Sequence, residues 1–213
     1  MGWPPDRDGL FSLLAARHTP EVQAGISAGR VAVAGLGGLG SHVATALARC
    51  GVGCLKLIDF DEVDESNLHR QCYFPRHVGR PKTSALKEML QDINPYIEIQ
   101  TADIRLTARN VPDVLAGWTV IVEALDDAAA KAELVTAALA AFQQARIISA
   151  SGLAGLGSAN DIVTRRAAGR LYVCGDGISE VAEGVSLMAP RVMVCAGHQA
   201  NLAIRLLLNN QEP

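Results

Sequence analysis

The sequence is poor in aromatic residues, which make up 4% of its 213 positions, and it has no excess of positive charge. Its formal net charge of −3 provides no general attraction for nucleic acid, so we expect no nucleic-acid partner. No uninterrupted apolar run is long enough to span a bilayer, and the first residues lack the pattern of a secretory signal. We therefore expect no membrane partner and a cytoplasmic location.

The cysteines argue against two further classes of protein. There are five of them, an odd number, and no Cys-x-x-Cys pair occurs. A disulfide framework would need an even set, and a zinc ribbon would need paired cysteines at short spacing. We expect reduced thiols and no bound zinc.

Small and branched apolar residues are abundant, and their spacing alternates between strand-like and helix-like segments. The expected strands are 30–35, 54–61, 97–104, 118–125 and 146–151. The expected helices are 6–28, 38–51, 81–94, 107–117, 127–144 and 190–210. Strands that alternate with helices predict a parallel sheet with helices on both faces. We expect one domain over residues 1–213, because neither a linker nor a repeat is visible.

The alternation breaks after Ser151, where glycine-rich turns separate one or two further strand-like runs. These runs favour antiparallel strands, followed by a loop at 175–189 and the long apolar helix at 190–210. The predicted fold class is α/β: a Rossmann-like, doubly wound, mainly parallel sheet with antiparallel C-terminal strands and a long C-terminal helix.

A glycine-rich loop follows the first strand, with the candidate ligand-binding positions Gly35, Gly37, Gly38 and Gly40. The G-x-G-x-x-G spacing between a strand and a helix allows the backbone to approach a phosphate at the helix N-terminus. Asp59 ends the second strand about 20 residues later, where an acid accepts hydrogen bonds from ribose hydroxyls. The pattern predicts an adenosine nucleotide and leaves NAD and ATP both open.

The stretch "DFDEVDESNLHRQ" (59–71) carries more polar groups than a dinucleotide requires. Arg70 can bind phosphate oxygens with its two-pronged guanidinium, and Lys82 can add a compact cation. Asn67 can donate an amide hydrogen bond, while Gln71 can hold the loop. Two cations in addition to the glycine-rich loop favour a triphosphate as the ligand. Alternatively, both could be ordinary solvent-exposed side chains of a loop that binds nothing.

Two acids, Asp126 and Asp127, follow the fourth parallel strand at its carboxyl end, the edge where ligands bind in such sheets. One carboxylate there can hold Mg²⁺ together with phosphate oxygens. Either acid could instead cap the next helix. We assign Asp126 to the metal and place Asp127 nearer the cap.

Together, "GLGGLGS", "LIDFDEVDESNLHRQ", "VGRPK" and the acid after the fourth strand resemble the ThiF/MoeB-type adenylyltransferases, relatives of ubiquitin-activating enzymes. The likeness runs from about residue 17 to residue 208. It implies binding of ATP and Mg²⁺ and adenylation of the C-terminal Gly-Gly carboxylate of a ubiquitin-like sulfur carrier, with release of pyrophosphate.

The resemblance also implies roles for individual residues. Gly37 and Gly40 are phosphate-loop positions, and the D-x-D element supplies Asp59 to the ribose and Asp61 to the same nucleotide-binding site. Asn67, Arg70 and Lys82 hold the triphosphate, and Asp126 holds the magnesium. Arg17 occupies the place of an arginine that the family donates across a homodimer interface, so the catalytic set is Arg70, Lys82, Asp126 and Arg17.

Many relatives carry two zinc-binding Cys-x-x-Cys pairs that are missing here. The chain looks like the short forms associated with thiamine biosynthesis, which implies a ThiS-type carrier. Some relatives link a cysteine covalently to the carrier. Cys174, at the end of an expected strand beside a loop, is the better candidate, and Cys195 suits the apolar face of the last helix.

Three alternatives remain from the residues. A related enzyme could adenylate another carboxylate, as for a molybdopterin carrier or a threonylcarbamoyladenosine-type dehydratase. An NAD-dependent oxidoreductase would account for the glycines and Asp59 but leaves Arg70, Lys82 and Asp126 without a role. A catalytically silent scaffold would not need these charged residues.

Overall fold

The computed structural model of the chain describes residues 5–210, and it is built on one seven-stranded sheet. The strand order is β3-β2-β1-β4-β5-β7-β6. The strands are β1 (Arg30–Ala34), β2 (Cys54–Asp59), β3 (Glu98–Asp103), β4 (Val120–Glu123), β5 (Arg146–Ala150), β6 (Val163–Ala168) and β7 (Leu171–Gly175).

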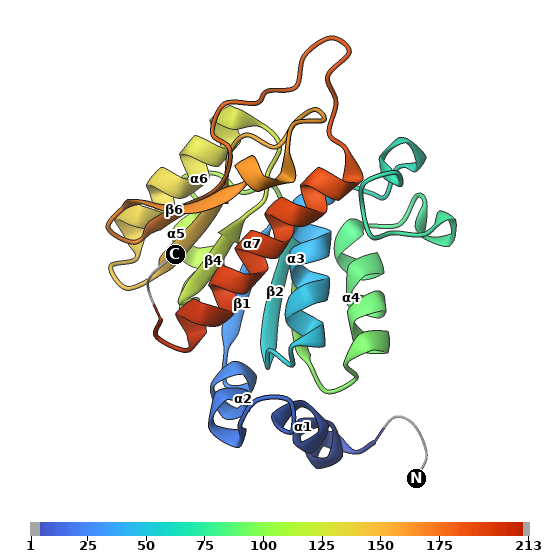
Figure 1. Cartoon of the computed structure of the whole chain (residues 1–213), viewed down its shortest axis with the longest axis vertical. Coiled ribbons are helices and arrows are strands. Elements are labelled where there is room, and N and C mark those ends of the chain that lie inside the picture. The colour runs from blue at the N-terminus through green and yellow to red at the C-terminus, as the bar shows by residue number, and fades with distance from the viewer. Residues whose placement is uncertain (1–4, 211–213) are drawn as a thin grey trace.

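Helices cover both faces of the sheet (Figure 1). The helices are α1 (Arg7–Ala15), α2 (Pro20–Ser27), α3 (Gly38–Arg49), α4 (Lys82–Ile93), α5 (Val111–Val114), α6 (Ala128–Ala141) and α7 (Ala189–Leu207). Short 3-10 turns lie at Glu65–Asn67, Pro75–His77 and Ala159–Asp161. One core cluster packs α3, α4 and α7 on one face, and a second packs α5 and α6 on the other.

The first strand shows why a continuous apolar run forms a buried strand here. Successive side chains of a strand point to opposite faces of the sheet. Val31 and Val33 belong to the core under α3 and α7, while Ala32 and Ala34 belong to the core under α6. Both faces are covered, so every position after Arg30 has to be apolar.

The chain reverses its direction of winding between β1 and β4. From β1 it passes through α3 to β2 and through α4 to β3, outward along one half of the sheet, and β4 and β5 then extend the other half. All these strands are parallel. In open α/β sheets, ligands bind beyond the carboxyl ends of the strands at such a switch point. This rule predicts a ligand site beyond the ends of β1 and β4.

The last two strands complete the sheet as a hairpin. β7 joins β5 in parallel, and β6 pairs antiparallel with β7 at the edge. α7 then crosses the sheet and packs against α3. The predicted fold class is confirmed, with the antiparallel pairing confined to β6 and β7.

The expectation of a single helix over 6–28 is wrong, because the segment forms α1 and α2. Pro20 lacks the N–H that a helix interior needs, so it begins a new helix whose N-cap, Thr19, accepts a hydrogen bond from the Val22 N–H. The helix expected at 107–117 is only the short turn Val111–Val114.

The expected single domain over residues 1–213 stays a prediction, and residues 1–4 and 211–213 lie outside the described residues. None of the helices within residues 5–210 has the length and apolar character needed to cross a membrane.

Candidate active site

The glycine-rich loop connects β1 to α3 at the switch point. Gly35 has a φ of +89°, and a Cβ there would lie 2.6 Å from the carbonyl oxygen of Ala124, which follows β4. A Cβ on Gly40 would overlap the carbonyl oxygen of Gly35. These two positions require glycine because β1, β4 and the start of α3 approach one another closely. No side chain caps α3 at Gly37, so its first N–H groups remain available to a phosphate.

Asp59 ends β2 and is almost completely buried. One of its carboxylate oxygens accepts a hydrogen bond from the Leu36 N–H at 2.6 Å. The other accepts from the N–H groups of Phe60 and Asp61 at 2.8 and 2.9 Å. Asp59 thus fixes the glycine-rich loop to the end of β2. Its role as a ribose ligand stays a prediction, and such a role would use the lone-pair capacity that these three bonds leave.

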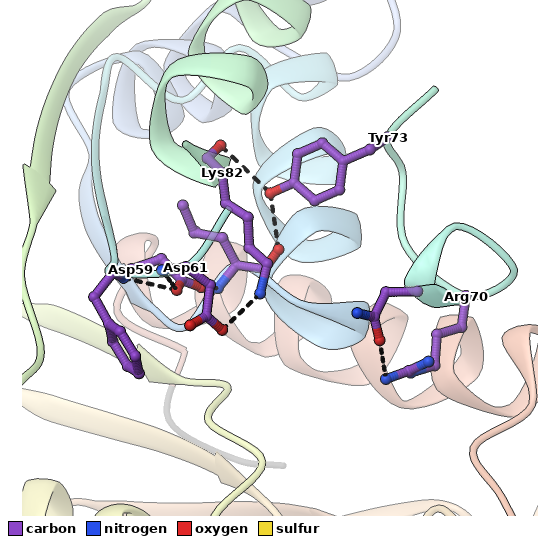
Figure 2. A network of polar contacts seen from close by, with 8 residues as sticks. Asp59, Asp61, Arg70, Tyr73 and Lys82 are labelled. Atoms are coloured by element: carbon purple, nitrogen blue, oxygen red, sulfur yellow. Dashed lines mark hydrogen bonds and ion pairs between the residues drawn. The ribbon is translucent and has the colours of Figure 1, made fainter. Parts of the chain in front are cut away.

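Lys82 begins α4, and Figure 2 shows its amine pointing at Asp61. The ion pair joins Nζ to the Asp61 carboxylate at 2.9 Å, and the side chain of Lys82 is only 8% exposed. The Tyr73 hydroxyl donates to the carbonyl oxygens of Leu36 and Lys82 at 2.9 and 3.4 Å. Burial, with Asp59 nearby, raises the pKa of Tyr73, so it stays a neutral donor. These contacts hold Lys82 beside the glycine-rich loop.

Arg70 lies at the other side of the start of α3 in Figure 2. Its guanidinium donates to the Asn67 side-chain oxygen at 2.7 Å. A Cβ on Gly38 would lie 3.4 Å from the Arg70 carbonyl oxygen, so the loop carrying Arg70 touches the start of the helix. Gln71 is buried beside Gly37, and its side-chain oxygen has no partner among residues 5–210. The structure therefore brings Asn67, Arg70 and Gln71 to the glycine-rich loop.

Of the two roles predicted for the acids after β4, the structure shows one, the helix cap. The Asp127 side chain accepts the Ala130 N–H at 2.7 Å and caps α6. Asp126 is exposed, and within the described part of the chain its carboxylate has no hydrogen-bond or ion-pair partner. A free carboxylate beside a phosphate loop suits Mg²⁺, which takes one or two protein carboxylates and completes its shell with phosphate oxygens and water. Its metal role stays a prediction.

Three residues near Asp126, namely Glu123, Lys131 and Ser149, were not singled out from the sequence. Glu123, the last residue of β4, is fully buried and forms an ion pair with Lys131 at 2.9 Å. Ser149 and Gln199 also bond to Glu123. The sequence does show Glu123 as an acid at the end of an apolar run. It does not show the partners of Glu123, which lie on α6, β5 and α7.

Two predicted residues lie away from this cluster. Arg17 is exposed between α1 and α2, which precede the amino end of β1, whereas the glycine-rich loop follows its carboxyl end (Figure 1). Cys174 lies near the end of β7, as predicted, but it is fully buried, which argues against it as the cysteine that links to a carrier. Burial raises its pKa to about 11, which keeps the thiol protonated. Cys195 belongs to the core, as expected.

No group of three or more His, Cys, Asp or Glu side chains within residues 5–210 is arranged to hold a metal ion. The expectation that the protein binds no zinc stays a prediction.

A doubly wound sheet with a glycine-rich loop at its switch point is typical of nucleotide-binding α/β proteins. This chain has both features, and the cationic side chains of Arg70 and Lys82 lie beside the loop. The sequence matches the ThiF family over residues 12–213, and the chain belongs to this family. It is 32% identical over 199 residues to the molybdopterin-synthase adenylyltransferase of Salmonella typhimurium, an alignment covering 91% of this chain and 78% of that protein.

Other relatives match over shorter stretches. The sulfur carrier protein adenylyltransferase of Thermus thermophilus is 37% identical over 109 residues, which cover 51% of this chain and 40% of that protein. The tRNA threonylcarbamoyladenosine dehydratase of Haemophilus influenzae is 33% identical over 127 residues, which cover 59% and 49%. The chain thus spans less than half the length of these two curated relatives.

Among solved structures, the tRNA N6-threonylcarbamoyladenosine dehydratase of Escherichia coli in complex with ATP superposes with a TM-score of 0.84. The match covers 93% of each chain at 20% identity, and it shows a shared fold. The predicted ThiF/MoeB-type identity is confirmed by the family match. The prediction of an enzyme of the adenylyltransferase class is confirmed by the family and by the names of the relatives.

Proposed function

We propose that this chain binds ATP and Mg²⁺ at the switch point and adenylates the C-terminal Gly-Gly carboxylate of a small ubiquitin-like sulfur carrier. The observation that carries the proposal is the position of Arg70 and Lys82, each beside the glycine-rich loop that begins α3. A redox dinucleotide presents two linked phosphates, which a glycine-rich loop satisfies by itself. Two further cations suit the larger charge of a triphosphate.

The reaction needs no nucleophile from the protein. A carboxylate oxygen of the carrier attacks the α-phosphorus, the bond from that phosphorus to the bridging oxygen breaks, and pyrophosphate leaves with the electron pair. The products are an acyl-adenylate and pyrophosphate. The chain has to align the two reactants and stabilise the charge that moves onto the leaving group.

Each site residue has a task in this scheme. The N–H groups at the start of α3 bind phosphate oxygens, and Asp59 orients the ribose through its free lone pairs. Arg70 and Lys82 stabilise the pyrophosphate as it departs, and Asn67 and Asp61 hold these two cations in place. Asp126 holds Mg²⁺, which when bound neutralises phosphate charge and helps the leaving group depart.

An exposed apolar surface beside the site favours a protein substrate. Leu156, Ile178 and Val181 are 85%, 84% and 64% exposed. The segments that carry them follow β5 and β7, whose parallel carboxyl ends share the edge of the active site. A hydrogen bond from Gly155 N–H to the Ser186 carbonyl at 2.9 Å joins these segments. Exposed apolar patches commonly mark protein-binding surfaces, and RNA would favour a basic patch.

The resemblance to short, zinc-less family members supports a ThiS-type carrier for thiazole formation in thiamine biosynthesis. We also propose a homodimer, because the family arginine that Arg17 represents acts on the partner's nucleotide. A cytoplasmic location, where cysteines such as those of this chain remain reduced, belongs to the same proposal.

Exchange of radiolabelled pyrophosphate into ATP is the direct test. We expect exchange to require Mg²⁺ and a carrier that ends in Gly-Gly, and to stop when the last glycine of the carrier is deleted. Absence of exchange with ThiS-type and molybdopterin-type carriers, combined with tight NAD binding, would refute the proposal in favour of an oxidoreductase.

The second candidate is a dehydratase of the threonylcarbamoyladenosine type, which the fold match and two sequence relatives favour. ATP consumption that depends on tRNA and is indifferent to a Gly-Gly carrier would select this candidate. The same preparation of protein serves both assays, so the two outcomes can be compared directly.

A further inference from the structure

Glu123 is a buried acid for which the scheme above has no task. Its side chain is fully buried at the end of β4. One carboxylate oxygen accepts the Leu125 N–H at 2.7 Å and the Lys131 amine at 2.9 Å, and the other accepts the Ser149 hydroxyl at 2.5 Å. A buried carboxylate is costly unless it is paired and hydrogen-bonded, and here both conditions are met.

Lys131 has a second contact, to the backbone. Its amine also donates to the Leu125 carbonyl oxygen at 2.6 Å. The two members of the ion pair therefore hold both the N–H and the C=O of Leu125, the residue immediately before Asp126. On the other side of Asp126, the Asp127 side chain is fixed by capping α6.

This short turn is also fixed against the rest of the active site. Ala124 presses against Gly35 of the glycine-rich loop, and its N–H donates to the Ala34 carbonyl at 2.8 Å. From α7, the Gln199 amide donates to the Glu123 main-chain oxygen at 3.0 Å. The backbone around Asp126 is therefore held by β1, β5, α6 and α7, while the Asp126 carboxylate stays free for a ligand.

We propose that the Glu123–Lys131 pair is a positioning device that sets Asp126 at a defined place relative to the glycine-rich loop. The inference rests on the proposed function, because Asp126 is the expected Mg²⁺ ligand. Glu123 and Lys131 do not touch the nucleotide in this scheme, and they act through the Leu125 peptide. Residues that orient metal ligands typically change metal affinity 10- to 100-fold when they are replaced.

The test measures Mn²⁺ binding to the protein with a non-hydrolysable ATP analogue, followed by electron paramagnetic resonance. Lys131→Gln alone leaves a buried carboxylate unpaired and can unfold the chain, so the informative variant is the double change Glu123→Gln with Lys131→Gln. It replaces the ion pair with neutral amides, and the shorter side chain at position 131 cannot reach the Leu125 carbonyl.

We expect the double variant to bind Mn²⁺ about 10- to 100-fold more weakly. Its affinity for the nucleotide without metal should stay within about twofold, and its melting temperature should stay near that of the original protein. Lys131→Arg should retain most of the Mn²⁺ affinity, because a guanidinium can bond both Glu123 and Leu125. Lys56→Gln is the matched control, since Lys56 also donates to a main-chain oxygen, that of Val114, 2.7 Å away and outside the site.

Unchanged Mn²⁺ affinity in the folded double variant would overturn the inference, as would a Lys131→Arg variant as weak as the double variant. Failure of ATP and metal binding at this site, the part of the proposed function on which the inference rests, has a separate signature, because the unaltered protein would then bind neither the ATP analogue nor Mn²⁺. Pyrophosphate exchange at varied Mg²⁺ adds a second readout. The double variant should need more Mg²⁺ for half-maximal rate and approach the original rate when Mg²⁺ is saturating.

Discussion

Arg70 and Lys82, the two cations at the active site, are each held by a residue of the loop that joins β2 to α4. Lys82 pairs with Asp61, and Arg70 donates to the side-chain oxygen of Asn67. Long side chains lose conformational freedom when they bind a ligand, and a side chain already held in place loses less of it. The partners of Lys82 and Arg70 therefore prepare the two cations for the triphosphate before it arrives.

Arg70→Ala and Lys82→Ala should each lower the rate of pyrophosphate exchange about 100- to 1,000-fold, because each removes a donor aimed at the departing charge. Melting temperature should fall only slightly, because neither side chain belongs to the core clusters. Arg76→Ala and Lys87→Ala are matched controls in the same loop and helix, and both should retain activity. Normal exchange in either test variant would remove the role assigned to that residue.

Cys174 illustrates how burial controls the reactivity of a residue. Burial raises the pKa of its thiol to about 11, and that of Cys195 to about 12. In the native protein at pH 7.5, iodoacetamide should therefore label exposed Cys50 well before either of these residues. Mass spectrometry of digested protein measures the order, and labelling in urea provides the unfolded reference. Prompt labelling of native Cys174 would reopen a covalent link to the carrier through this residue.

At the scale of elements, the segment between β7 and α7 is anchored by one buried ion pair. Asp176 follows β7, and Arg191 lies in the first turn of α7. Their side chains are only 7% and 5% exposed and form a close ion pair, and Arg191 also donates to the Ser158 carbonyl at 2.7 Å. The pair thus ties together the segments that carry the exposed apolar residues (Figure 1).

Arg191→Met should lower the free energy of unfolding by about 3–5 kcal/mol, because it leaves the buried Asp176 carboxylate without its cation. Arg205→Met is the control on the same helix, since Arg205 bonds only to exposed Asn210 among the described contacts of its side chain. Urea unfolding followed by circular dichroism measures both. A loss below about 1 kcal/mol would mean that the pair does not anchor this segment.

The ion pair between Asp176 and Arg191 should also make the free energy of unfolding depend on pH in acid. Burial opposes ionisation of Asp176, but hydrogen bonds from the Ser179 and Ile178 N–H groups, with Arg191 nearby, lower its pKa from 3.8 to about 2. A lowered pKa contributes stability that is present above about pH 4 and is lost as the pH falls toward 2. The stability difference between the original protein and Asp176→Asn should therefore shrink over this range. A difference that stays constant from pH 6 to pH 2.5 would contradict the assignment.

At the scale of the whole molecule, the sheet separates Arg17 from the active site. The five residues of β1 alone span about 16 Å, and they separate the glycine-rich loop from α2 and the connection before it, which carries Arg17. The Arg17 side chain is too short to cross this distance to its own site. A catalytic role for Arg17 therefore requires a second copy of the chain.

A heterodimer of Arg17→Ala and Asp126→Ala subunits, isolated with two different affinity tags, should recover about half the activity of the original dimer, because in a two-fold dimer one of its two sites is then intact. Each homodimeric variant should be nearly inactive. An inactive heterodimer made of folded subunits would exclude donation of Arg17 across the interface.

The sequence by itself determined the order of strands and helices and the position of the nucleotide loop. These features depend on neighbouring residues: apolar runs such as 31–34 form buried strands, and the glycines at 35 and 40 allow the tight turn into α3. Pro20 divides the segment expected to form the first helix, again by a local rule, because proline lacks the N–H that a helix interior needs.

Only the tertiary structure decided how distant segments meet. It paired Glu123 with Lys131 and Asp176 with Arg191, buried Cys174 inside the sheet, and placed Arg17 at the edge opposite Asp126. Such contacts depend on how strands and helices pack, and no spacing along the chain encodes them. Motif residues could be found from the sequence because their chemistry is local, whereas the residues that hold them in place emerge only once the chain has folded.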